Sequence, residues 1–136
     1  MSAIVVSGND GEGLKRVYEN SAWMVGVKNY KTANDAAKFD EIELHRETDE
    51  LFVLIDGVCI LLEAVVDGGR LRFEAQRMKR GLVYVIPSSH WHTTITEPGV
   101  KLVLIEDPKT GSANSEVRKL ADADLEAAKA AIAAAR

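Results

Sequence analysis

Carboxylate and imidazole side chains gather in one segment of the chain, residues 41–57, where they could bind a metal ion or transfer protons. Glu43 and His45 lie two positions apart, so in a β-strand their side chains point to the same face. Glu50 comes directly before Leu51–Ile55, an apolar run that indicates a strand buried on both faces. Because a charge beside a buried strand needs a partner or a metal, this segment is the first candidate for a functional site.

The order and spacing of these residues resemble the two motifs of the cupin superfamily. The first motif has two histidines, a glutamate and a glycine, and its places are held here by Glu43, His45, Glu50 and Gly57. Glu43 therefore stands where the family has its first histidine. The second motif has two glycines, a proline and a histidine, and its places are held by Gly81, Pro87, Ser89 and His92. The resemblance covers roughly residues 39–106 and is closest to small stand-alone cupins.

The resemblance implies that His45, Glu50 and His92 project into a barrel and hold a divalent metal ion. Two imidazoles and one carboxylate suit a transition metal and leave coordination positions open. Glu43 shares a face with His45 and is the candidate fourth ligand. With Glu43 the set contains two carboxylates, which favours harder ions such as Mn or Fe(II), while Ni and Zn are further candidates. Glu43 and His90 are the candidate catalytic groups, since either side chain can move a proton.

The same residues also fit an interpretation without a metal. Glu43 and His45 would then belong to the wet face of an exposed strand, together with Glu41 and Glu47. His90 has the same parity as His92, but it equally fits a solvent-facing loop position.

Two functional hypotheses follow from these alternatives. The first is a metal-dependent enzyme that acts on a small organic acid or sugar derivative, of the isomerase, dioxygenase or decarboxylase type that the resemblance implies. The second is a small-molecule binding or sensing barrel without turnover, in which His45 and Glu50 bond to each other or to a ligand and no ion is present. A fold alone does not choose between the two.

Short apolar or alternating segments recur along the chain between turn residues, and they predict a mainly β protein. Crossover helices have no room between these segments, so the sheets should be antiparallel, as in a jelly-roll β-barrel. Asp56-Gly57 is a typical hairpin turn, and Gly26 marks a bulge or a close backbone approach. About eight short strands are expected, at residues 3–6, 23–30, 39–47, 51–55, 58–66, 71–76, 82–86 and 100–105. Residues 88–96 form the second motif, in which His90, His92, Thr94 and Thr96 share a parity.

The end of the chain has a different composition. Residues 107–115 are rich in turn-forming residues and predict a surface connection. Beyond them a C-terminal α-helix is expected from Asp122, as its N-cap, to Arg136. We therefore divide the chain into a cupin barrel, residues 1–108, and a linker with a helix packed on or near the barrel, residues 109–136.

Composition and charge restrict the possible partners. The formal net charge of −4 provides no basic surface for nucleic acid, and no basic amphipathic or membrane-spanning segment is evident. The N-terminus lacks the features of a signal peptide, and the single cysteine, Cys59, lies in an apolar strand. These features predict a cytoplasmic protein with a small-molecule ligand or substrate.

The strands at residues 51–55 and 58–62 are apolar on both faces, more than one barrel interior can bury. We therefore expect a homodimer that covers an outer sheet face.

Overall fold

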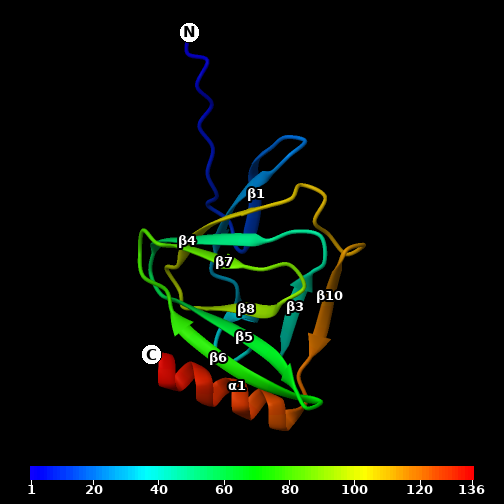
Figure 1. Ribbon diagram of the computed structural model, residues 1–136. Helices are drawn as coiled ribbons and strands as arrows, with labels where there is room; N and C mark the ends of the chain where they lie inside the picture. Colours follow the sequence, from blue (N-terminus) through cyan, green and yellow to red (C-terminus); the bar gives the residue numbers. More distant parts are fainter.

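The alternating segments form ten β-strands in the computed structural model, which describes residues 1–136, and one α-helix closes the chain (Figure 1). A short 3-10 helix, Thr32–Asn34, follows the second strand. The elements are β1 (Leu14–Glu19), β2 (Met24–Asn29), β3 (Glu41–His45), β4 (Glu50–Asp56), β5 (Cys59–Asp67), β6 (Arg70–Arg77), β7 (Val83–Ile86), β8 (Trp91–Thr96), β9 (Lys101–Glu106), β10 (Ser115–Lys119) and α1 (Asp122–Ala135).

The strands make two five-stranded sheets that face each other. The first sheet has the order β1-β2-β9-β4-β7, and the second has the order β10-β3-β8-β5-β6. All the pairings within both sheets are antiparallel. The prediction of a mainly β, antiparallel jelly-roll barrel with a C-terminal helix is confirmed.

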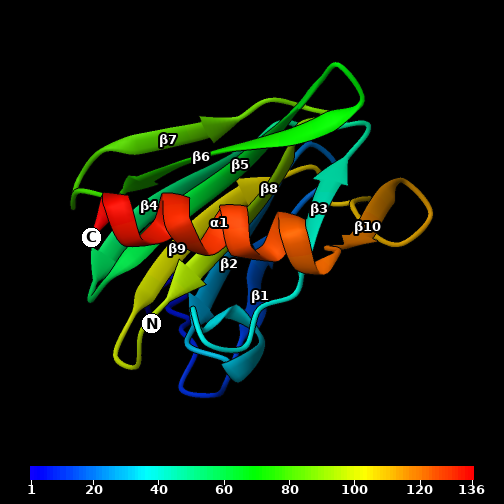
Figure 2. The same ribbon diagram turned by 90° about the horizontal axis from the view of Figure 1, so that it is seen from below.

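Apolar residues build two separate cores, one on each side of the second sheet. Leu61 on β5 belongs to the core between the sheets, together with Phe52 and Leu102 from the first sheet. The next residue, Leu62, points to the opposite face and packs in a second core against α1, which crosses this sheet in Figure 2. Ile132 anchors the helix there, and burying such a side chain contributes about 1.5–3 kcal/mol. The outer face of β5 is therefore covered by the chain's own helix.

The outer face of the first sheet has no such cover. The strand register places eight aliphatic side chains on this face, which we call the aliphatic face, and they come from β2, β9, β4 and β7. Val83 and Val85 at its β7 edge are 60% and 53% exposed. Its members are Val25, Val27, Leu51, Val53, Val83, Val85, Val103 and Ile105.

Three details of the predicted fold are wrong. Residues 3–6 form no strand: Ile4, Val5 and Val6 are at least 81% exposed, and this end of the chain projects from the body in Figure 1. The strands β1 and β10 were missed because both are largely exposed edge strands, whose charged residues do not show an apolar alternation. Because β10 pairs with β3, part of residues 109–136 belongs to the second sheet and not to a linker.

Two predictions from local sequence signals, a hairpin and a helix N-cap, are also wrong. The Asp56-Gly57 turn joins β4 to β5, but these strands lie in different sheets and form no hairpin. The N-cap of α1 is Ala121 and Asp122 is already helical, where its carboxylate lies near the positive end of the helix dipole. Gly26 marks a close approach of side chains and not of backbone, because a Cβ there would lie 2.5 Å from Leu14 Cδ1 and 3.3 Å from Leu104 Cδ1. The chain contains no helix with the length and apolar character needed to cross a bilayer.

Candidate metal centre

The two sheets bring four potential metal ligands together inside the barrel. Glu43 and His45 come from β3, and His92 lies on the neighbouring strand β8, where it pairs with Glu43. Glu50 comes from β4 in the opposite sheet. One ligand atom from each of the four residues lies within 4.8 Å of the others. The interpretation of an exposed strand face fails for His45, which is only 9% exposed.

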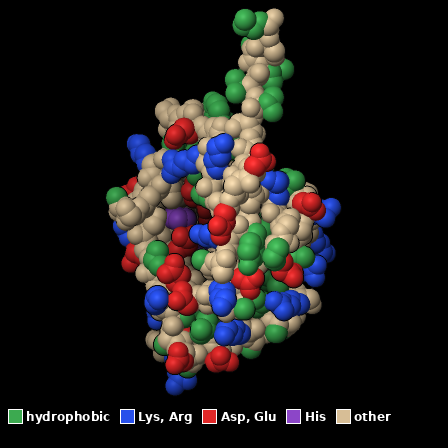
Figure 3. Space-filling model, turned by 180° about the vertical axis from the view of Figure 1, so that it is seen from behind, with side chains coloured by type: hydrophobic (Ala, Val, Ile, Leu, Met, Phe, Trp, Pro, Cys, Tyr) green, Lys and Arg blue, Asp and Glu red, His purple; other side chains and the backbone are tan.

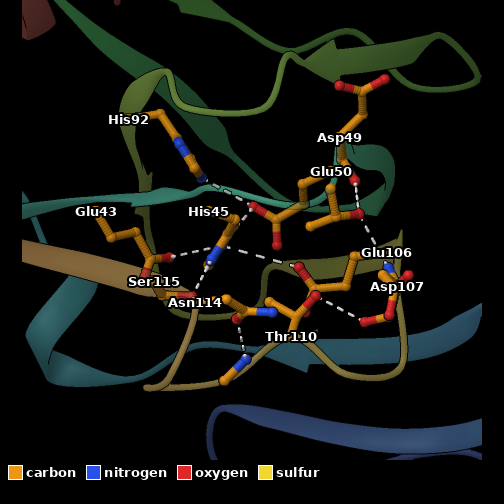
Figure 4. Close-up of polar contacts among 12 residues, drawn as sticks. Glu43, His45, Asp49, Glu50, His92, Glu106, Asp107, Thr110, Asn114 and Ser115 are labelled. Atoms are coloured by element: carbon orange, nitrogen blue, oxygen red, sulfur yellow. Dashed lines mark hydrogen bonds and ion pairs between the residues drawn. The ribbon is translucent and has the colours of Figure 1, made fainter.

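One carboxylate oxygen, Oε1 of Glu50, lies at the centre of this cluster (Figure 4). It is 2.9 Å from Nε2 of His92 and 3.6 Å from Nε2 of His45. Oε1 of Glu43 lies 3.9 Å from the same His45 nitrogen. Glu50 and His92 are almost fully buried, whereas the Glu43 side chain is 45% exposed. The cluster is therefore closed on one side by the core and open on the side of Glu43.

In both imidazole rings, the nitrogen that points away from the cluster has a hydrogen-bond partner. Nδ1 of His92 donates to the backbone carbonyl of His90 at 2.9 Å. Nδ1 of His45 lies 2.8 Å from Oγ of Ser115, a residue of the β10 strand that the sequence analysis missed. When these Nδ1 atoms carry the protons, both Nε2 lone pairs face the cluster, which is how metal-binding histidines are usually oriented.

The cluster lines a cavity of about 360 Å³ that opens to solvent. Figure 3 shows a histidine at the bottom of this hollow, among acidic and basic side chains. The basic side chains that line it are Arg16, Lys28 and Lys31. Glu106, at the end of β9, is a further buried carboxylate of the cavity, with Oε2 3.8 Å from Nε2 of His45. Sequence analysis identified neither Lys28 nor Glu106.

The structure does not bring His90 into the cluster. Its Nε2 lies 3.1 Å from Oε2 of Glu63, and Glu63 lines a different hollow of about 520 Å³ between β6 and β7. His90 reaches the metal-ligand candidates only through its carbonyl, which accepts the His92 hydrogen bond. The expectation of a catalytic imidazole at residue 90 therefore has no support in the geometry.

Burial and close charges set the protonation of the centre. Burial by itself would raise the pKa of Glu50, but the contacts with His45 and His92 outweigh it and hold that pKa well below its usual range. The contact with Glu50 raises the pKa of His45. Burial, with the nearby charge of Glu50, raises the pKa of Glu106 to about 8. Glu106 is therefore a neutral carboxylic acid near pH 7 when no metal is present.

This pKa predicts that the metal-free protein loses stability as the pH rises. A glutamate in the unfolded chain titrates near pH 4.5, so between pH 5 and 9 the folded protein binds more protons at residue 106 than the unfolded chain does. The free energy of unfolding should fall by about 2–4 kcal/mol over this range. The raised pKa of His45 acts in the same direction. Urea unfolding in the presence of a chelator measures the change.

Glu106→Gln is the control for this titration, because it keeps the shape of the side chain and removes the ionisation. The variant should lose most of the pH dependence between pH 6 and 9 and should exceed the wild type in stability at pH 9. A wild-type protein whose stability is constant or increases over this range would contradict the prediction.

Comparison with solved structures finds the same arrangement of strands in several proteins. KdgF from Halomonas sp. is 18% identical, with a TM-score of 0.51 over 74% of this chain and 81% of that one. A variant of the oxalate decarboxylase OxdC from Bacillus subtilis is 16% identical, with a TM-score of 0.52 over 71% of this chain and 24% of that one. Streptomyces Pac13, a nucleoside dehydratase, was solved with uridine and is 11% identical, with a TM-score of 0.57 over 79% of this chain and 77% of that one.

No protein-family model matches the chain, and no curated protein matches it by sequence. At identities this low, the structural neighbours establish the fold and not the activity.

Proposed function

We propose that this chain, a small protein with the cupin fold, holds a divalent transition-metal ion at its centre and acts on a small organic acid or sugar derivative. The ligands would be His45, Glu50 and His92, with Glu43 as the fourth. The observation that carries the proposal is the orientation of the two rings: both Nδ1 atoms are bonded away from the cluster, and both Nε2 atoms face one carboxylate oxygen.

The donor atoms fit a single ion. Metal–ligand bonds to nitrogen and oxygen are about 2.0–2.2 Å long, so donors around one ion lie at most about 4.4 Å apart. Three contacts among the four side chains, of 2.9, 3.6 and 3.9 Å, are within that limit, and all four donors lie within 4.8 Å of one another. Oε2 of Glu106 is buried beside the cluster without a hydrogen-bond partner, and a cation would compensate it. Two imidazoles and two carboxylates suit Mn or Fe(II), and also Ni or Zn.

A bound ion would polarise a carbonyl or carboxylate group of the substrate. The chain's own residues would move the proton: Glu106 is a buried carboxyl group beside the cluster, and Glu43 is a carboxylate at the open side. Two of the structural neighbours carry the names of enzymes that act on small molecules, oxalate decarboxylase and nucleoside dehydratase. These names support a catalytic role without selecting a reaction.

One observation favours the alternative, a binding or sensing barrel without a metal. His92 and Glu50 already form a hydrogen bond of 2.9 Å, so the ring and the carboxyl group satisfy each other when no ion is present. Such a barrel would bind a metabolite in the cavity without turning it over.

Metal analysis separates the two functions. The full chain is purified without chelator, its metal content is measured by plasma emission, and small organic acids are then screened for turnover by NMR. We expect about one ion of Mn, Fe, Ni or Zn per chain and turnover that depends on this ion. Metal-free protein that stays folded and binds a metabolite unchanged would establish the alternative.

Ser115→Ala should weaken metal binding, because Oγ of Ser115 is the partner that orients the His45 ring. Loss of such a partner typically lowers metal affinity about 10- to 100-fold. Ser112→Ala is the matched control, since Ser112 lines the same cavity without a hydrogen bond to a ligand residue. Competition with a fluorescent chelator measures both affinities, and equal affinities for the two variants would refute the role of Ser115.

We also propose that the aliphatic face binds a second copy of this chain. The face is continuous across four strands, and Val83 and Val85 at its edge are more than half exposed. A two-fold axis would pair two such faces, because the same patch is then buried on both subunits. Light scattering at micromolar concentration should give twice the monomer mass, and Val83→Lys with Val85→Lys should give the monomer. A wild-type monomer under these conditions would refute the dimer.

A further inference from the structure

A lysine from the opposite sheet reaches the metal-centre cavity beside His92. Lys28 lies on β2, and its Nζ donates to Oγ1 of Thr94 at 2.9 Å. Thr94 follows His92 by two residues on β8, so both side chains point into the barrel. Successive inward-facing residues on a strand are about 6–7 Å apart. The ammonium group is therefore one step along the barrel from the proposed ligand His92.

The charge of Lys28 has no carboxylate partner. No carboxylate oxygen lies within 4.0 Å of its Nζ, although Glu43 and Glu50 line the same cavity. Its only hydrogen-bond acceptor in the chain is the hydroxyl of Thr94, and an ammonium has three donors. Burial, and then the charge of Lys31, lowers the pKa of Lys28, as expected for a cation with too little compensation.

A bound metal ion would make this imbalance larger. The carboxylates of Glu43 and Glu50 would neutralise the divalent ion, and Lys28 and Lys31 would then carry positive charge without a counterpart. An ionised Glu106 would cancel only one of these two charges. With the ion in place, the cavity therefore has an excess of positive charge that an anionic ligand would compensate.

We infer that Lys28 is the residue that binds a carboxylate of the substrate, which makes small organic acids the preferred ligand class of this cavity. The inference rests on the proposed metal centre. A ligand with two oxygen-bearing groups a few bonds apart would reach the ion with one group and Lys28 with the other. The Thr94 hydroxyl accepts from Lys28 and can donate its own proton to the same carboxylate.

Malonate, a short dicarboxylate, tests the inference with Lys28→Met in the full chain. Both proteins are loaded with Co²⁺, whose visible spectrum reports a ligand entering the coordination sphere, and are titrated with malonate. Loss of a hydrogen bond between charged groups typically weakens binding about 10- to 100-fold. We expect that loss for Lys28→Met, partial recovery for Lys28→Arg, and no change for Lys129→Met on the surface of α1.

The controls separate this inference from the proposed metal centre. Malonamide, the neutral analogue, should bind weakly to the wild type and should be insensitive to Lys28→Met. Unchanged cobalt content with weakened malonate binding supports the inference. Equal malonate affinity in the two cobalt-loaded proteins overturns it. A wild type that does not bind malonate also overturns it. Neither result contradicts the proposed metal centre. If no metal binds, the proposed function fails, and calorimetric titration of the metal-free wild type and Lys28→Met with malonate decides whether Lys28 binds a carboxylate.

Discussion

His92→Ala should reduce the metal content of the purified protein from about one ion per chain to less than about a tenth of that. The side chain is 2% exposed, and its Nε2 lies 2.9 Å from the central oxygen of Glu50. Its loss removes one of only two nitrogen donors, which are the ligands that distinguish a transition metal from Mg or Ca. Metal affinity should fall by more than about 100-fold, beyond the effect of losing an orienting partner. Plasma emission after dialysis against metal-depleted buffer measures the result.

His90→Ala is the matched control, because it makes the same substitution two residues earlier. The ring of His90 contacts Glu63 outside the cluster, and only its backbone carbonyl, which alanine keeps, supports the His92 ring. This variant should retain the metal of the wild type. Loss of metal from both variants would indicate a general disturbance of β8, and metal retained by both would exclude His92 as a ligand. Circular dichroism confirms that each variant is folded.

The strands that the sequence predicted are those in which apolar residues define a face. Strand β5 was evident because Leu61 and Leu62 are buried on opposite sides, against the first sheet and against α1. The edge strands β1 and β10 make few buried contacts and consist largely of exposed residues, so their conformation depends on pairing with β2 and β3. Pairing of this kind is a tertiary effect that a local pattern does not contain.

The Ala3–Val6 segment is the opposite case. Its β-branched residues have the composition of a strand, but no neighbouring strand of the same chain pairs with it. The composition therefore predicted a strand, but the segment does not form one because the monomer offers no strand for it to pair with.

The candidate ligands could be found in the sequence because their neighbours identify the inward face. In β3, Ile42 belongs to the second core and Leu44 is also buried, which leaves Glu43 and His45 on the face toward the cavity. Glu106 and Lys28 gave no such signal, because the strands β9 and β2 carry apolar residues on both faces. Leu104 points into the core and Val103 onto the aliphatic face. Because both are apolar, the alternation of side chains along the strand does not show which face points inward. Ser115 could not be found for a further reason, since its strand was itself missed.

Gly57→Ala should destabilise the fold by about 3 kcal/mol or more. Gly57 has φ of +76°, a conformation that costs an L-residue about 1–2 kcal/mol. An added Cβ would also lie 2.7 Å from Cα and 2.8 Å from the nitrogen of Val100, and 2.9 Å from the carbonyl oxygen of Gly99. These are backbone atoms of the turn before β9, and they cannot rotate away as the end of a side chain can. Urea unfolding followed by tryptophan fluorescence measures the loss.

Gly99→Ala separates the two causes, because Gly99 has φ of +92° but no atom within 4 Å of an added Cβ. It should cost only about 1–2 kcal/mol, the conformational part of the Gly57 effect. Equal destabilisation by both variants would show that the steric contact with Val100 does not contribute to the effect of Gly57→Ala. The Gly57 contact joins the β4–β5 connection to the turn that precedes β9, at the end of the barrel away from the metal ligands. Gly57→Ala should therefore lower metal binding only in proportion to the unfolded fraction, whereas His92→Ala should remove the metal from a protein that remains folded.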